Sequence, residues 1–154
     1  MAAQIKNPAM IIPQAMQAHR IFANRNKVIY WTSTLWLALG MLSTGLVQLF
    51  KMKAEGAASG VDGITHLGYP IYFLTILGIW KILGIVAVLV PKFPLVKEWA
   101  YAGFFFAMSG AIFSHMASGN PVTEIFPALL LLVLTIISWY FRPAERKVTS
   151  ANQL

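Results

Sequence analysis

The chain contains no cysteine, and only five of its 154 residues are acidic. Without cysteine it can form neither disulfides nor thiolate metal sites, and iron–sulfur clusters and dithiol redox relays are excluded as well. The three histidines, His19, His66 and His115, show no metal-ligand spacing and have no acidic cluster beside them. A nucleophile elbow is also absent. The sequence therefore predicts no metal site and no catalytic residue.

Charged residues of either sign are scarce: they make up 11% of the chain, whereas 58% of its residues are hydrophobic. This composition excludes an ordinary soluble protein and predicts a small integral membrane protein with one domain. A net charge of +7 can indicate nucleic-acid binding, but most of the basic residues flank apolar runs. Orientation in a membrane explains them better, so we expect the lipid bilayer, and no nucleic acid, as a partner.

Four apolar segments are long enough to cross a bilayer, because about 20 residues rising about 1.5 Å each span roughly 30 Å of hydrocarbon. They lie at about residues 28–50, 70–90, 99–117 and 122–141. The predicted fold is an all-α bundle of four transmembrane helices within residues 28–141, preceded by a tail over 1–27 and followed by a tail over 142–154. Residues 13–26 fit either a short amphipathic surface helix or a mobile tail.

Small and turn-forming residues indicate how the spans connect and pack. The four glycines within residues 51–69 predict a flexible loop. Before the fourth span, Asn120 is placed to cap the helix and Pro121 to occupy its first position. Small residues repeat at every fourth position from Gly103 and from Gly110, which predicts that the third helix is the most closely packed.

Basic residues predict the orientation of the bundle. Four spans place both termini on one side, and lysine and arginine accumulate on the cytoplasmic side of membrane proteins. Only Lys51 and Lys53 would lie on the opposite side. We therefore expect both termini to be cytoplasmic and the protein to be a multi-pass protein of the inner (plasma) membrane. The basic residues on the cytoplasmic side are then Lys6, Arg20, Arg25, Lys27, Lys92, Lys97, Arg142, Arg146 and Lys147.

One lysine, Lys81, lies near the middle of the second span. A lysine at the bilayer centre costs roughly 2.5 to 3.5 kcal/mol, which the flanking apolar residues outweigh at about 0.3 to 0.6 kcal/mol each. Gly78 and Gly84 lie three residues before and after it and share its helix face, so we expect Lys81 to face the bundle interior. It is either a binding or proton-handling group, or a structural lysine that snorkels or pairs with a neighbour.

Each of the other spans adds a polar group at its predicted outer end. In the first span Thr44 fits a bond to a carbonyl one turn back, and Gln48 either lines a cavity or meets the headgroups. His115 ends the third span. Glu124 begins the fourth, where the helix dipole alone favours a carboxylate, although a carboxylate near an imidazole is also typical of proton-handling sites. We predict a ligand-binding pocket open to the outer side, with Lys81 as its floor and the long loop as its roof.

Three parts of the chain resemble the DoxX-like family of small bacterial membrane proteins: GIWKILG at 78–84, KEWAYAGFFF at 97–106, and Ser114-His115. The similarity covers roughly residues 27–142. It implies a four-helix membrane bundle. Because the family is named from a membrane subunit of a thiosulfate:quinone oxidoreductase, it also implies that a quinone or another lipophile is a candidate ligand, although no cofactor is identifiable from the residues themselves.

These observations predict an accessory or binding subunit of a quinone-linked membrane redox system, not an enzyme that acts alone. A redox partner protein and a second copy of the chain are its expected partners. Related chains often carry an acidic residue at Ala107 and a lysine at Gln48, which argues against an inherited redox or proton-transfer role. The alternative is a small transporter or channel with Lys81, His115 and Glu124 as its polar path, and it would require an oligomer because four helices enclose little volume.

Overall fold

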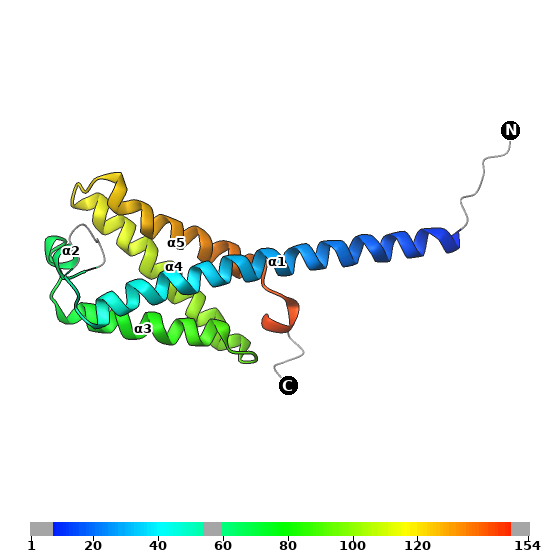
Figure 1. Ribbon diagram of the computed structural model, residues 1–154, viewed down its shortest axis with the longest axis horizontal. Helices are drawn as coiled ribbons and strands as arrows, with labels where there is room; N and C mark the ends of the chain where they lie inside the picture. Colours follow the sequence, from blue (N-terminus) through cyan, green and yellow to red (C-terminus); the bar gives the residue numbers. More distant parts are fainter. Residues whose placement is uncertain (1–7, 54–59, 149–154) are drawn as a thin grey trace.

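A computed structural model describes residues 8–53 and 60–148, and for residues 8–20 and 23 it describes the backbone alone. These residues form five α-helices and a short 3₁₀ helix, with no strand among them (Figure 1). The elements are α1 (Pro8–Leu49), α2 (Val61–His66), α3 (Tyr72–Leu89), α4 (Pro94–Ala117), α5 (Val122–Tyr140) and η1 (Ala144–Arg146).

Four of the helices, α1, α3, α4 and α5, are long and apolar enough to cross a membrane. The predicted fold class, an all-α membrane protein with four spanning helices, is confirmed. Helix α1 packs against α3 and α5, and α4 packs against the same two helices, so the four close into a ring. Many large apolar side chains, among them Trp36, Leu39 and Trp80, point outward, as expected for helices in contact with lipid.

Helix α1 is longer than the sequence predicted, because it begins at Pro8 and not near Val28. Its spanning part is Asn24–Leu49, and the preceding turns project beyond the other helices (Figure 1). Residues 13–26 are therefore helical and continuous with the first span. Between Pro13 and Gly40 the chain contains neither glycine nor proline and is rich in good helix formers. This stretch therefore has no helix-breaking residue that would separate residues 13–26 from the first span. Residues 1–7 and 149–154 of the predicted tails lie outside the described residues.

The connection predicted to be a flexible loop contains a helix, α2. The side chain of Ile64 is buried against the bundle. This burial stabilises α2, although the glycines in and beside it disfavour a helix. Gly68 follows α2 with φ of 81°, in the left-handed region that favours glycine. Residues 54–59 of this connection lie outside the described part of the chain. We call the end of the bundle that carries α2 the α2 side, and the opposite end the terminal side.

Among the described glycines, Gly78 of α3 is the one that another helix's backbone approaches most closely, and that helix is α1. The expectation that α4 is the most closely packed helix was wrong. A Cβ added at Gly78 would lie 2.9 Å from the carbonyl oxygen of Gly45 and 2.9 Å from the backbone nitrogen of Leu49. At Gly103 and Gly110 of α4, in contrast, an added Cβ would meet nothing within 4 Å. The repeats of small residues on α4 were visible in the sequence, but the rotation of the helix leaves these two glycines exposed.

An apolar core fills the middle of the bundle and separates polar residues on its two sides. Each of the four spanning helices contributes to it. Its buried residues are Leu37, Met41, Ile85, Val88, Tyr101, Phe104, Met108 and Leu131.

On the terminal side, two of the basic residues that the sequence placed beside the spans, Lys97 and Arg142, are buried. The ammonium of Lys97 donates to the carbonyl oxygen of Ala87 at 2.7 Å and to two further carbonyl groups at the end of α3. It thereby satisfies acceptors that have no partner within the helix. Arg142 forms an ion pair with Glu98, which also accepts a hydrogen bond from Trp139 Nε1 at 2.9 Å. These cations hold the helix ends together.

Candidate functional site

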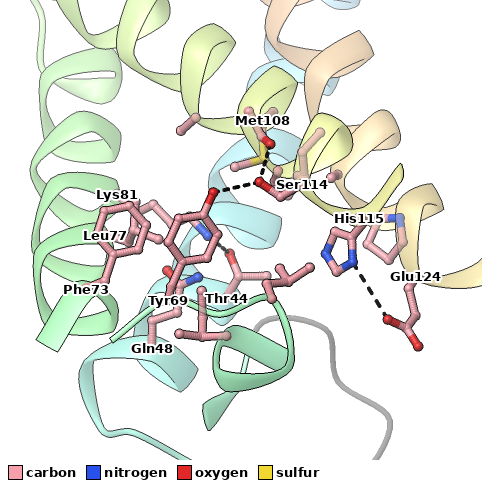
Figure 2. A pocket seen from close by; sticks show the side chains of 18 of the residues that line it. Thr44, Gln48, Tyr69, Phe73, Leu77, Lys81, Met108, Ser114, His115 and Glu124 are labelled. Carbon is pink, nitrogen blue, oxygen red and sulfur yellow. Dashed lines mark hydrogen bonds and ion pairs between the residues drawn. The ribbon is translucent and has the colours of Figure 1, made fainter. Parts of the chain in front are cut away.

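A cavity of about 420 Å³ lies on the α2 side of the core, and all four spanning helices line it (Figure 2). Helix α1 contributes Thr44 and Gln48, α3 contributes Lys81, α4 contributes His115, and α5 contributes Glu124. These are the five residues selected from the sequence. The tertiary structure therefore brings them to one cavity, although they lie on four separate helices.

Lys81 is buried, with 6% of the residue exposed, and faces the cavity as the flanking glycines predicted. Its Nζ donates to Thr44 Oγ1 at 3.1 Å, and the Thr44 hydroxyl donates in turn to the carbonyl oxygen of Gly40 at 3.0 Å. Gly45 makes this position possible, because a Cβ there would lie 3.3 Å from the Lys81 Cβ. The close approach of α1 and α3 thus directs the lysine toward the bundle interior and away from lipid.

Gln48 lies one turn beyond Thr44 on α1 and is buried, with 4% of the residue exposed. It lines the cavity, which favours the first of the two positions that the sequence left open. Its Oε1 has no hydrogen-bond partner within the part of the chain that the structure describes. A buried acceptor without a partner costs about 1–3 kcal/mol, so this oxygen favours a bound water molecule that donates a hydrogen bond to it.

His115, Asn120 and Glu124 form a polar cluster where α4 turns into α5. Asn120 Nδ2 lies 3.0 Å from His115 Nδ1 and donates to Glu124 Oε2 at 2.5 Å. Since an amide nitrogen only donates, His115 Nδ1 accepts, and the neutral ring carries its hydrogen on Nε2. The 3.7 Å between His115 Nδ1 and Glu124 Oε2 is then a polar contact bridged by Asn120 and not an ion pair.

The expected capping of the fourth helix by Asn120 was wrong. Pro121 occupies the N-cap position of α5, with no side-chain hydrogen bond there. The amide of Asn120 instead binds the carboxylate of Glu124, which lies in the first turn. A carboxylate acceptor makes a stronger hydrogen bond than a neutral group, which explains why the Asn120 side chain turns toward Glu124.

The cavity is covered by α2 and the residues that follow it. Ile64 and Leu67 line it on this side. The hydroxyl of Tyr69 shares a 2.8 Å hydrogen bond with Ser114 Oγ of α4 (Figure 2). The Tyr69 ring stacks on Phe73, with 5.1 Å between ring centroids. The sequence analysis did not identify Tyr69 as a cavity residue. Its only local signal was a tyrosine directly after a glycine-rich connection.

Most of the remaining wall is apolar. Phe73 and Leu77 of α3, Met108 of α4 and Leu131 of α5 face the cavity. Apolar walls with a few polar groups in fixed positions are typical of sites for small molecules. Within the described residues, no three histidine or acidic side chains come close enough to hold a metal ion.

In the comparison with protein families, a model described as the DoxX-like family matches residues 32–138. The chain belongs to the DoxX-like family. The matched range of this DoxX-like protein runs from α1 to α5 and includes all five predicted site residues. Together with the four spanning helices, it establishes a multi-pass membrane protein. Comparisons with curated proteins and with solved structures give no match.

Proposed function

We propose that this DoxX-like protein is a non-catalytic binding subunit that holds a small lipophilic molecule in the cavity on the α2 side. The main support is Lys81, an ammonium buried in a cavity whose walls are largely apolar. Ionisable residues at this depth in a membrane commonly serve a function, because their burial is otherwise unfavourable. A lipophile with an oxygen-bearing head group would fill the apolar part and accept a hydrogen bond from Lys81.

The redox context of the proposal comes from the family resemblance. A quinone is a lipophile with carbonyl oxygens, and the donors needed to bind it are available at Lys81 and at the amide nitrogen of Gln48. Since the chain contains no cysteine, electrons would be carried by the bound molecule and by a redox partner protein. We place the protein in the inner membrane with both termini cytoplasmic and the cavity in the outer half, alone or as a homo-oligomer.

The apolar core favours binding over transport. A polar path through Lys81, His115 and Glu124 would have to continue toward the terminal side, but Leu37, Met41 and their core neighbours fill that region. An ion that entered the cavity would meet side chains that offer no compensation for lost hydration. A channel would therefore need a second path, such as one between subunits.

Replacement of Lys81 tests the proposal. Lys81→Met keeps the aliphatic length and removes the charge, so the variant should fold at least as well as the wild type. Its membrane insertion should become more favourable by up to roughly 2.5 to 3.5 kcal/mol on insertion scales. It should nevertheless lose the lipophile that co-purifies with the wild type. Lys81→Arg should retain part of it, because a guanidinium keeps the charge but is larger and planar.

The measurement combines mass spectrometry of lipophiles extracted with the purified protein and thermal unfolding of the same samples. Lys147→Met is the matched control, since Lys147 is exposed on the terminal side and does not line this cavity. Equal stability with unchanged lipophile content in Lys81→Met would reject the proposal and leave a purely structural lysine.

A further inference from the structure

We infer that the occupant of the cavity is a single-chain acidic amphiphile, whose carboxylate binds Lys81 and whose tail passes between α3 and α4 into the surrounding lipid. This inference rests on the proposed function and specifies its ligand class. It follows from two independent features, the uncompensated charge at the floor of the cavity and the apolar opening in its side.

The charge of Lys81 has no counter-ion among the described residues. The ion pair between charged side chains that they contain joins Arg142 to Glu98, and Glu124 contacts the neutral ring of His115. Thr44 accepts one hydrogen bond from the ammonium, which can donate three. A neutral carbonyl would accept another but would leave the charge uncompensated. A carboxylate would supply both the acceptor and the opposite charge, in an environment where a buried unpaired ion is strongly unfavourable.

The carboxylate that the cavity itself contains is already engaged. Glu124 accepts a hydrogen bond from Asn120 at 2.5 Å, at the end where α4 turns into α5. Its side chain is partly exposed, whereas Lys81 is buried. Among the described residues no carboxylate pairs with Lys81, and a ligand that enters the cavity is in position to supply one.

The opening lies between α3 and α4 on the α2 side. Phe106 and Gly110 of α4 line the cavity and are also exposed on the outside of the bundle, Phe106 with 70% of its surface. The two helices pack closely nearer the terminal side, where Gly84 meets the ring of Phe104. Toward α2 they diverge (Figure 1), and the hydrogen bond between Tyr69 and Ser114 spans the gap.

The size and surface of this opening suit an alkyl chain. A volume of about 420 Å³ is at the small end of the range for ligand sites, so it encloses a head group and the first part of a chain. The rest of a longer chain must continue outside, and the exposed ring of Phe106 beside the opening faces hydrocarbon. The volume holds one head group with the start of its chain, which favours a single-chain amphiphile.

The test uses the full-length protein in phosphatidylcholine nanodiscs and two photoactivatable probes, a diazirine-bearing palmitic acid and the alcohol with the same chain. Cross-linked peptides are quantified by mass spectrometry. The acid should label cavity residues about tenfold more than the alcohol, which corresponds to a charge-assisted contact. In Lys81→Met this preference should disappear, while thermal unfolding shows that the variant is folded.

The route is tested separately by a matched pair of glycine variants. Gly110→Leu places a side chain in the opening and should reduce labelling by both probes, whereas Gly103→Leu, on the same helix and equally open, should not. Equal labelling of the wild-type cavity by acid and alcohol would overturn the acidic head group but leave lipophile binding intact. If neither probe labelled the cavity and Lys81→Met retained as much lipophile as the wild type, both the inference and the proposed function would be overturned.

Discussion

Substitution of Gly78 by alanine should separate α1 from α3 and weaken the whole bundle. The new Cβ would lie 2.9 Å from two backbone atoms of α1, the Gly45 oxygen and the Leu49 nitrogen, and 3.1 Å from the Leu49 Cβ. Backbone atoms cannot rotate away as a side chain can, so the helices must move apart. Overpacking of this kind costs about 1–3 kcal/mol. The movement should also lengthen the hydrogen bond from Lys81 to Thr44.

Gly103→Ala is the control for this prediction, because the added methyl group meets nothing within 4 Å. Both substitutions gain up to about 1 kcal/mol of helix propensity, so the difference between them isolates the packing term. We expect Gly78→Ala to be less stable than Gly103→Ala by about 1–3 kcal/mol, with a shift in Tm of roughly 2–4 °C for each kcal/mol in a chain of this size.

Thermal unfolding of both variants in the same nanodiscs, followed by tryptophan fluorescence, measures this difference. The reasoning would be refuted if the two variants unfolded at the same temperature. In that case the contact between α1 and α3 would not limit the spacing of the helices, and the orientation of Lys81 would require another explanation.

Three further predictions concern other parts of the chain. For the topology, single cysteines are introduced at Ser59 and Ser150, both outside the described residues. In intact cells an impermeant thiol reagent should label the cysteine at 59 and not the one at 150, and labelling at 150 but not at 59 would reverse the predicted orientation. Tyr69→Phe removes the hydroxyl that bonds to α4 and should speed amide hydrogen exchange in α2, with at most about 1.5 kcal/mol lost in the free energy of unfolding. Unchanged exchange would show that this hydrogen bond does not hold α2 over the cavity. Glu98→Met leaves the buried guanidinium of Arg142 without its carboxylate and should lower the free energy of unfolding by about 1–3 kcal/mol in chemical denaturation, whereas an unchanged value would exclude a stabilising ion pair.

The number of spans and the fold class were determined by the sequence. Each span is a local property, because about 20 apolar residues match the thickness of the bilayer wherever the helix packs. The inward orientation of Lys81 could be predicted for a similar reason. Gly78 and Gly84 lie on the same helix as Lys81, at spacings that helix geometry places on one face.

Which helix faces come together was decided only by the tertiary structure. Small residues on α3 predicted a close contact correctly, but the same kind of pattern on α4 failed, because Gly103 and Gly110 are exposed. The sequence showed Lys97 and Arg142 only as basic residues beside the spans, whereas in the structure the ends of α3 and α4 provide acceptors for them. Helix rotation depends on all neighbours at once, and no single segment contains that information.

The cavity combines both kinds of information. Its five polar residues could be selected from the sequence because each is costly or unusual at its depth in an apolar helix. Its cover could not, since α2 is stabilised by burial of Ile64 against helices distant in the chain, and Tyr69 becomes a cavity residue only through its bond to Ser114. Local helix geometry and bilayer thickness therefore determined which residues are available, and the packing of four helices decided which of them share one space.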